Sequence, residues 1–322
     1  MTRQRLTVVA PVYNEVRGIE HFTDAVLRVL VDLPYDSTVV LVDDGSTDGT
    51  AAVLDRLHDA HPDRLTVIHL SRNFGHQAAL TAGMDYADGD AVICMDADLQ
   101  HPPSVIPQML ERWQHGFDIV QTVRQQTENV GWFKDVTARL FYALINYLSA
   151  TRIEPNGCDF RLLSRRVVEV FRKDIRERDR FIRGLVSWVG FRYCTIEFDA
   201  ASRFAGETKY SLTKMLSFAR VGLVSFSKVP LKVAALFGFG VSVLSGLYGL
   251  FAVSAYLFFS RAVMPGWASM IVVATFLGGC QLVFLGLIGE YIATIFDETK
   301  GRPLYIVADV RDASAPVSKP DE

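Results

Sequence analysis

Two long apolar runs without a charged side chain constrain the fold of this chain more than any other feature. Val233–Phe259 is a run of 27 residues and Ala262–Gly289 a run of 28, and neither contains Asp, Glu, Lys or Arg. About 20 apolar residues are enough for a helix to cross a bilayer. The sequence therefore predicts two transmembrane helices and excludes an ordinary fully soluble protein. Because 50% of the residues are hydrophobic, an intrinsically disordered chain is excluded as well.

The basic residues around these runs predict how the chain crosses the membrane. Only Arg261 lies between the runs, whereas several basic residues stand on both outer sides of the pair: Lys209, Lys214, Arg220, Lys228, Lys232, Lys300 and Arg302. The positive-inside rule then places both termini in the cytoplasm. The N-terminal segment has no signal-peptide core, and the four cysteines show no zinc-binding spacing. We therefore expect a multi-pass protein of the inner or plasma membrane with a cytoplasmic N-terminal domain.

The charge of the chain changes sign along its length. Met1–Leu110 contains 7 basic and 16 acidic residues, a net charge of -9, whereas Arg161–Lys232 contains 16 basic and 7 acidic residues, a net charge of +9. The net charge of the whole chain is only -3, which argues against a general nucleic-acid binder. The acidic part is a candidate for metal binding. The basic part either faces an anionic lipid or reflects the positive-inside rule alone.

The first 120 residues alternate strand-like and helix-like segments. The expected strands are Leu6–Ala10, which Pro11 should end, Thr38–Val42, Leu65–Leu70 and Ala91–Met95, and the expected helices are Gly18–Asp32, Asp48–Ala60 and His76–Tyr86. This alternation predicts βαβ units and a Rossmann-like, mostly parallel α/β sheet. Ligands of such sheets bind beyond the carboxyl ends of the strands. Polar clusters stand at those ends: Tyr13-Asn14-Glu15, Asp43-Asp44-Gly45-Ser46 and Asp96-Ala97-Asp98.

Two of these clusters suggest chemistry. Asp96 and Asp98 directly follow a strand and can share a divalent cation such as Mg²⁺, which binds a few carboxylates together with substrate phosphate oxygens. Asp pairs at strand ends are also ordinary turn residues. The DDGSTDGT segment at 43–50 is either a capped strand-to-helix turn or a site for a base or ribose edge; the turn alone leaves its two adjacent Asp residues unexplained.

Seven segments together resemble a known family. VAPVYNE at 9–15, DDGSTDGT at 43–50 and DADLQ at 96–100 have the order and spacing of family 2 glycosyltransferases of the GT-A fold. RNFGHQAAL at 72–80, DFRLLSR at 159–165, RFIRGL at 180–185 and RFAGETKYS at 203–211 are similar to the polyprenyl-phosphate subgroup, which includes bactoprenol glucosyltransferases, aminoarabinose transferases and dolichol-phosphate mannose synthases. The resemblance covers roughly Leu6 to Ile295.

The resemblance implies roles for individual residues. Pro11, Tyr13 and Glu15 would line the nucleotide, with Asp43 on the uracil or ribose. The metal, Mg²⁺ or Mn²⁺, would be held by Asp98 with Gln100 and Asp96, and Asp96 would also lie near the ribose and the diphosphate. Asp159 would stand at the reaction centre, as a base or as an electrostatic stabiliser. The acceptor phosphate would be held by four basic residues: Arg124, Arg139, Arg203 and Lys209.

The implied reaction is an inverting transfer of one hexose from a nucleotide sugar to undecaprenyl or another polyprenyl phosphate, for cell-envelope glycosylation. Glucose from a UDP-sugar is the first choice, and aminoarabinose, mannose or GalNAc-type sugars stay open. The acceptor phosphate has a second pKa near 6, so the nucleophile arrives charged at pH 7. A processive synthase and a non-catalytic membrane scaffold are the rival hypotheses. Only two predicted spans count against the first, and the intact acidic motifs count against the second.

The expected domains are a GT-A domain over 1–210, a juxtamembrane amphipathic helix over 211–232, two transmembrane helices over 233–295 and a polar cytoplasmic tail over 296–322. A second amphipathic stretch lies between Val136 and Ala150. Such stretches either pack in the core or lie at the membrane interface. We also expect a homo-oligomer, for which the subgroup suggests a tetramer.

Overall fold

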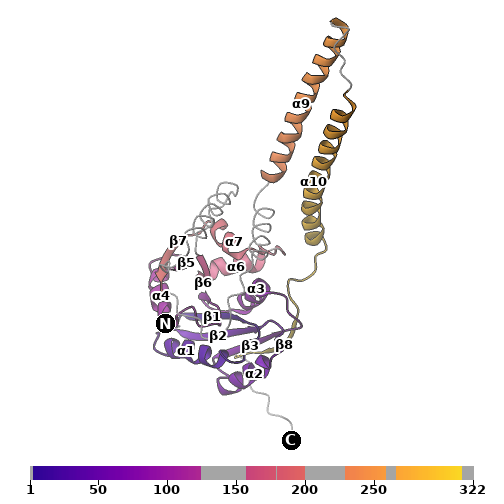
Figure 1. Cartoon of the computed structure of the whole chain (residues 1–322). Helices are drawn as coiled ribbons and strands as arrows, with labels where there is room; N and C mark the ends of the chain where they lie inside the picture. The colour runs from indigo at the N-terminus through magenta and orange to yellow at the C-terminus, as the bar shows by residue number, and fades with distance from the viewer. Residues whose placement is uncertain (1–2, 125–156, 179, 200–228, 259–265, 314–322) are drawn as a thin grey trace. The chain divides into compact units, whose positions relative to one another are not determined.

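An eight-stranded sheet organises the first of two units of the chain (Figure 1). The structure is a computed structural model, and it describes residues 3–124, 157–178, 180–199, 229–258 and 266–313. The strands are β1 (Arg5–Val12), β2 (Asp36–Asp43), β3 (Leu65–Leu70), β4 (Ala91–Cys94), β5 (Ile119–Arg124), β6 (Gly157–Ser164), β7 (Tyr193–Phe198) and β8 (Val307–Arg311).

The strand order is β7-β5-β6-β4-β1-β2-β3-β8. Strands β4, β1, β2 and β3 are mutually parallel, β5 and β7 are parallel to each other, and β6 and β8 run antiparallel to their neighbours. The predicted mostly parallel α/β fold is therefore confirmed. The carboxyl ends of β1, β2 and β4 meet at one edge of the sheet, where the sequence places its polar clusters.

Helices cover both faces of this sheet (Figure 1). They are α1 (Ile19–Val31), α2 (Thr50–Ala60), α3 (His76–Tyr86), α4 (Ile106–Gln114), α6 (Arg165–Lys173) and α7 (Ile182–Trp188), with a short 3₁₀ turn at Pro103–Val105. Every residue of β1 from Leu6 to Val12 is buried. A strand buried on both faces reads as a continuous apolar run, which is why the sequence pattern located β1 to β4 well.

Strand β1 passes through Pro11, so the expectation that Pro11 ends it was wrong. The carbonyl oxygen of Val9 accepts a hydrogen bond from the Met95 backbone nitrogen, and that of Val12 accepts one from Asp44. Because successive residues of a strand turn to opposite sides, the Pro11 nitrogen faces the β4 side. The pairing of β4 with β1 ends opposite Val9, so Pro11 has no ladder hydrogen bond to lose there.

Strand β8 was not foreseen. It lies in the polar segment after the second apolar run and pairs antiparallel with β3, so that His69 stands opposite Asp309 and Val67 opposite Arg311. The segment before it is also fixed, because the Tyr305 hydroxyl donates to Asp85 Oδ2 at 2.7 Å. The segment that was expected to be a simple tail therefore adds an edge strand to the sheet.

The second unit contains two long helices, α9 (Val229–Phe258) and α10 (Trp267–Thr299). Leu231–Phe251 and Val272–Thr299 are long and apolar enough to cross a membrane, with mean hydropathies of 1.8 and 2.0. The rings of Phe237 in α9 and Phe284 in α10 meet edge to face at 5.8 Å between centroids. The two helices therefore contact each other, as expected for a helical hairpin. The predicted stretch at 136–150 and residues 211–228 of the predicted juxtamembrane helix lie outside the described residues, and residues 229–232 of that predicted helix lie in α9.

Candidate active site

The loops after β1 and β2 are joined by hydrogen bonds between backbone and side chains. The Asn14 backbone nitrogen donates to Ser46 Oγ at 3.0 Å, and the Thr47 nitrogen donates to Asn14 Oδ1 at 2.8 Å. Asn14 has a φ of 55°, a left-handed conformation that Asn tolerates better than most residues. The Glu15 nitrogen donates to Thr50 Oγ1 at 3.0 Å. The two loops therefore form one rigid wall above the sheet.

A cavity of about 230 Å³ lies against this wall, and it is lined by Pro11, Val12, Tyr13, Asp44, Asn73, Gly75 and His76. Pro11 and Tyr13 were predicted to line a nucleotide, and both line this cavity. Tyr13 is 46% exposed, so one face of its ring is accessible to a ligand. Asn73 and Gly75 were quoted for the resemblance but given no role. Only the long-range approach of the 72–76 loop to the β2 end brings them here.

Asp43 and Asp44 have different surroundings. Asp43 is 3% exposed; its Oδ1 accepts a hydrogen bond from the Ser46 nitrogen at 3.0 Å, and its Oδ2 lies 3.1 Å from His69 Nδ1. Asp44 is the cavity-lining acid, and its carboxylate accepts hydrogen bonds from the Phe74 and Gly75 nitrogens at 2.7 and 2.9 Å. Burial raises the pKa of Asp44, against the lowering effect of these hydrogen bonds. Asp43 thus lies behind the turn that lines the cavity.

Gly45 allows the loops around β2 and β3 to meet. Its φ is 68°, and a Cβ added there would lie 2.5 Å from the backbone carbon of Arg72. Any larger residue would therefore push the 72–76 loop away from the cavity. This close approach explains why the DDGST turn carries glycine between its acids and its hydroxyls.

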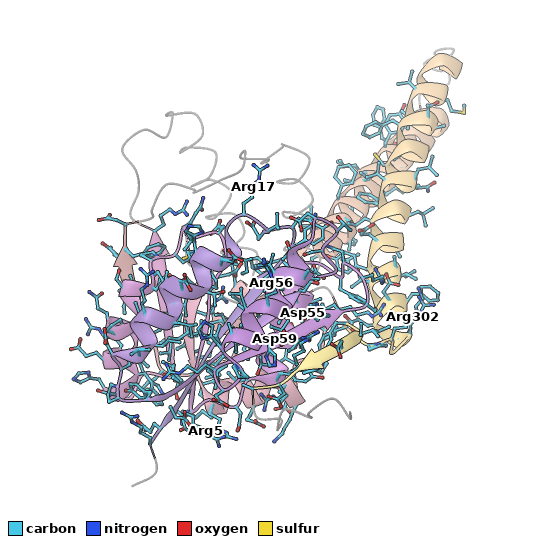
Figure 2. All side chains as sticks on the ribbon, turned by 90° about the horizontal axis from the view of Figure 1, so that it is seen from below. Arg5, Arg17, Asp55, Arg56, Asp59 and Arg302 are labelled. Atoms are coloured by element: carbon cyan, nitrogen blue, oxygen red, sulfur yellow. The ribbon has the colours of Figure 1, made fainter. Side chains whose placement is uncertain are left out.

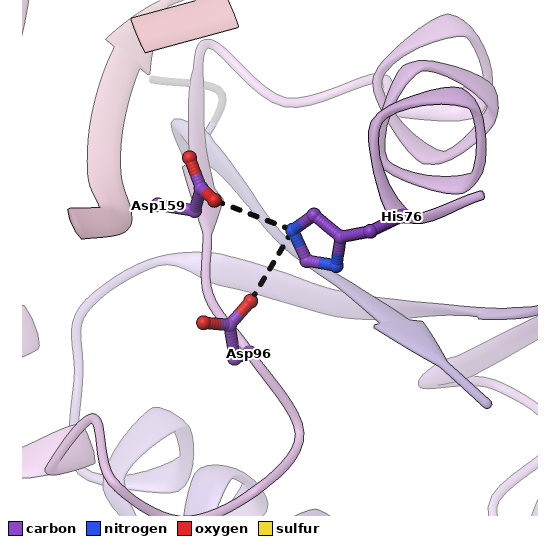
Figure 3. A group of neighbouring side chains, drawn as sticks. All are labelled: His76, Asp96 and Asp159. Atoms are coloured by element: carbon purple, nitrogen blue, oxygen red, sulfur yellow. Dashed lines mark ion pairs between the residues drawn. The ribbon is translucent and has the colours of Figure 1, made fainter. Parts of the chain in front are cut away.

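A second group of side chains comes from three elements: His76 begins α3, Asp96 follows β4 and Asp159 lies in β6 (Figure 3). Asp96 Oδ1 lies 3.4 Å from His76 Nε2, and His76 Nε2 lies 3.4 Å from Asp159 Oδ2. The ligand atoms of His76, Asp96 and Asp159 all lie within 4.8 Å of one another. Burial raises the pKa of Asp96, and the neighbouring charges of Asp159 and Asp98 act in the same direction. This arrangement of acids around one point suits a cation.

The predicted metal ligands Asp98 and Gln100 stand in the same loop. Asp98 Oδ1 accepts a hydrogen bond from the Gln100 nitrogen at 3.1 Å, and Leu99 between them has a φ of 62°. A leucine in this left-handed conformation is uncommon and marks a backbone held in a special shape. Gln100 Oε1 accepts a hydrogen bond from Arg124 Nη2 at 2.9 Å. The loop therefore brings together Asp98, Gln100 and Arg124, which the sequence had linked to metal and acceptor phosphate.

Asp159 is neutralised by arginines. Its Oδ1 lies 2.5 Å from Arg161 Nη2, and its Oδ2 lies 3.1 Å from Arg183 Nη2. Burial alone would raise the pKa of Asp159, but the hydrogen bond to His76 and the charges of Arg161 and Arg183 hold it well below its usual range. Arg161 is completely buried. Asp159 is therefore an ionised carboxylate fixed from two sides.

Two possible ligand sets for a metal share Asp96. Both carboxylate oxygens of Asp159 already face guanidinium groups, Oδ1 that of Arg161 and Oδ2 that of Arg183. Asp96 Oδ1 is buried without a hydrogen-bond partner among the residues that the structure describes. Asp96, Asp98 and Gln100 offer only oxygen donors, the kind that a hard cation prefers, so they stay the predicted ligand set.

Three predicted acceptor-site residues, Arg139, Arg203 and Lys209, lie outside the described residues. Two arginines that contact Asp159 were given no role from the sequence. Arg161 stands two residues after Asp159 on β6, so the period of a strand puts both side chains on one face, and that spacing was a usable signal. Arg183 comes from α7, and no local spacing links it to Asp159.

Comparisons with known proteins identify the family of this chain. The family profile described as Glycosyl transferase family 2 matches residues 7–171. An uncharacterized glycosyltransferase of Synechocystis is 42% identical over 307 residues, covering 95% of this chain and 95% of the relative. A prophage-derived bactoprenol glucosyl transferase of Shigella flexneri is 41% identical over 304 residues, covering 94% of this chain and 97% of the relative.

Among solved structures, a mannosyltransferase of Pyrobaculum calidifontis in complex with GDP-Man and Mn²⁺ is 19% identical. It covers 90% of this chain, the chain covers 88% of it, and the TM-score is 0.47. The family assignment rests on the sequence matches, which extend over nearly the whole chain.

Proposed function

This chain belongs to glycosyltransferase family 2, and we propose that it transfers one glucose from UDP-glucose to undecaprenyl or another polyprenyl phosphate. The observation that carries the proposal is the near-full-length similarity to the bactoprenol glucosyl transferase of Shigella flexneri. The product, a polyprenyl-phosphate glucose, would serve cell-envelope glycosylation. The position of the acidic group beside the cavity supports the reaction, because a nucleotide in the cavity would bring its diphosphate towards Asp96 and Asp98.

The donor would enter with its nucleoside in the cavity. The cavity has a volume of about 230 Å³, which is smaller than the roughly 300–1,000 Å³ of a typical ligand pocket. It therefore suits part of a nucleotide sugar. Tyr13 would lie against the nucleoside, and Asp44 and Asn73 would offer polar atoms to it. Glu15 would contribute at the rim, and Asp43 would act through the turn that it supports.

Asp96, Asp98 and Gln100 would hold Mg²⁺ or Mn²⁺. When bound, such an ion supplies positive charge that stabilises the departing diphosphate. His76 lies between Asp96 and Asp159, with contacts of 3.4 Å to each, and it keeps the two carboxylates at a fixed separation.

The acceptor would bind through its phosphate. A polyprenyl phosphate is largely a dianion at pH 7, so it needs orientation more than deprotonation. Arg124 would contribute one of the cations, and Arg139, Arg203 and Lys209 complete the proposed set. A single in-line displacement at the anomeric carbon would invert its configuration. The ionised Asp159 would stabilise positive charge that develops on the sugar.

We propose a membrane-bound enzyme with its active site in the cytoplasm. We propose a catalytic domain over 1–210, an amphipathic segment over 211–232 and two spans over 233–295, followed by a segment over 296–322 that contains β8. A homo-oligomer is part of this proposal, and a monomer in native mass spectrometry from mild detergent would contradict it.

We expect both termini on the cytoplasmic side, because the basic residues flank the two spans on their outer ends. Single cysteines placed at Pro265 and near the C-terminus can be reacted with a membrane-impermeant thiol probe in intact cells. The cysteine at Pro265 should be labelled, and the C-terminal one should react only after the cells are permeabilised. The reverse pattern would contradict the proposed topology.

The proposed reaction predicts a lipid product. Membranes that contain the protein, supplied with labelled UDP-glucose and polyprenyl phosphate, should form a chloroform-soluble labelled lipid. A matched panel of UDP- and GDP-sugars tests the choice of sugar. If the lipid product forms only from a different nucleotide sugar, the sugar of that donor replaces glucose in the proposed reaction. If no donor gives a lipid product but a soluble polymer forms, the processive synthase is favoured. If no sugar is transferred at all, the non-catalytic scaffold is favoured.

A further inference from the structure

A line of alternating charges runs from the donor side of the sheet to the C-terminal strand. Asp43 Oδ2 lies 3.1 Å from His69 Nδ1, and His69 Nε2 lies 3.1 Å from Asp55 Oδ1. Asp55 Oδ1 lies 2.9 Å from Arg311 Nε in β8, and Arg311 Nη1 lies 3.4 Å from Asp59. Figure 2 shows Asp55 and Asp59 on α2, next to the edge of the sheet that β8 forms.

The geometry fixes the charge of His69. A neutral imidazole carries one N–H, and a carboxylate can only accept hydrogen bonds. Because both ring nitrogens of His69 face carboxylate oxygens, only the imidazolium satisfies both contacts. The hydrogen bond to Asp43 raises the pKa of His69 most strongly, burial opposes it, and Asp55 adds to the rise. Asp309 of β8 is paired with His69 in the strand register.

Asp43 connects this line to the donor cavity. Asp43 Oδ1 accepts a hydrogen bond from the Ser46 backbone nitrogen, and Ser46 Oγ accepts one from the Asn14 backbone nitrogen. Asp44, the next residue, lines the cavity directly. Burial would raise the pKa of Asp43, but the hydrogen bonds from His69 and Ser46 keep it below its usual value. Hydrogen bonds therefore connect the Asp43 carboxylate to the turn at the cavity wall.

The far end of the line is firmly anchored. The Ser71 nitrogen donates to the Ile306 oxygen at 2.9 Å, and the Ala313 nitrogen donates to Thr66 Oγ1 at 3.2 Å. These contacts fix the segment on both sides of β8, so Arg311 is presented to Asp55 by a paired strand and not by a loose tail. The side chain of Arg311 is 37% exposed, whereas that of His69 is only 14% exposed.

We propose that His69 is a positioning residue for the nucleotide half of the donor site, and that β8 holds it in place through Arg311 and Asp55. The ligand whose binding it controls is a nucleoside diphosphate or its sugar. This inference rests on the proposed function, because it takes the cavity beside Asp44 as the nucleotide site. The C-terminal strand then contributes to substrate binding although its residues lie more than 200 positions from the other donor-site residues in the chain.

The test compares His69→Gln and Arg311→Gln with the control Arg56→Gln in the full-length protein in detergent. Arg56 also lies on α2 and makes an ion pair, but with the exposed Glu20 (Figure 2). Calorimetric titration with UDP and Mn²⁺ should show roughly 10- to 150-fold weaker binding for His69→Gln, the effect of losing a hydrogen bond between charged groups. Arg311→Gln should weaken binding less, about threefold to tenfold, because its pair is partly exposed. The control should bind as the wild type does.

Two further readouts separate positioning from a general loss of structure. The His69 contribution is present while the imidazole is protonated and is lost as the pH rises through its raised pKa. UDP affinity of the wild type should therefore contain a fall with rising pH that His69→Gln lacks. The KM for polyprenyl phosphate should not change in either variant. If His69→Gln does not fold, Asp55→Asn provides the same comparison from the other side of the ring.

The outcomes distinguish the inference from the proposed function. If His69→Gln and Asp55→Asn bind UDP as tightly as the wild type does, the inference is overturned and the proposed function is unaffected. Weaker UDP binding in these variants, together with a wild type that makes no polyprenyl-linked sugar, would keep the inference and overturn the function. A wild-type protein that binds no nucleotide would overturn both.

Discussion

Replacing Asp98 with alanine is expected to lower glucosyl transfer by at least about 10³-fold. Asp98 stands in the loop after β4 with Gln100 bonded to its carboxylate, and it would supply a ligand to the metal that stabilises the leaving diphosphate. Metal stabilisation of this kind contributes several kcal/mol to a transition state. Since each 1.36 kcal/mol corresponds to a factor of ten in rate, a loss of about 4 kcal/mol gives the expected effect. Initial rates with UDP-glucose and polyprenyl phosphate measure it.

A binding measurement shows whether the loss comes from the metal. UDP should bind the wild type more tightly when Mn²⁺ is present, and Asp98→Ala should lose that difference. Asp24→Ala, which removes an exposed acid on α1, is the matched control and should keep both activity and metal dependence. If Asp98→Ala kept the Mn²⁺ effect, the ligand set of His76, Asp96 and Asp159 would have to replace the one proposed, and His76→Ala would then abolish it.

The parallel half of the sheet was predictable because its signals are local. Strands β1 to β4 are mostly buried, so each reads as a largely apolar run between turn residues. Strand β8 gives no such signal. In Val307–Arg311 the two charged residues, Asp309 and Arg311, face His69 and Asp55. The partners of these charges lie far away in the sequence. The segment on its own therefore predicts only a polar tail.

The candidate site divides in the same way. Asp96, Asp98 and Gln100 come from one short loop, so their spacing already linked them. His76, Arg161 and Arg183 converge on Asp159 from α3, β6 and α7, and Figure 3 shows the contact with His76. Their meeting depends on how the sheet is ordered, with β6 inserted between β4 and β5. The sequence motifs marked these segments as special, but only the fold shows that they neutralise one carboxylate.

The second large effect is expected at Asp159. Asp159→Asn should lower kcat by about 10²- to 10³-fold, the range seen when one electrostatic contact with a transition state is removed. The reason is charge and not proton transfer. A general base works best with a pKa near the operating pH, and Arg161, Arg183 and His76 hold the pKa of Asp159 well below its usual range. The carboxylate stays ionised throughout the pH range in which the acceptor phosphate titrates.

The pH profile tests this assignment. If Asp159 acts by charge alone, kcat/KM for the lipid should fall as the pH drops below about 6, where the acceptor phosphate gains a proton. Asp159→Glu, which keeps the charge, should retain more activity than Asp159→Asn and should show the same pH midpoint as the wild type. A midpoint that moved with the Asp159→Glu substitution would instead identify the carboxylate as a base. Because Asn leaves the buried Arg161 without its partner, the folded state of Asp159→Asn needs checking by its thermal unfolding. A variant that melts like the wild type but has lost transfer would assign the whole loss to the reaction centre.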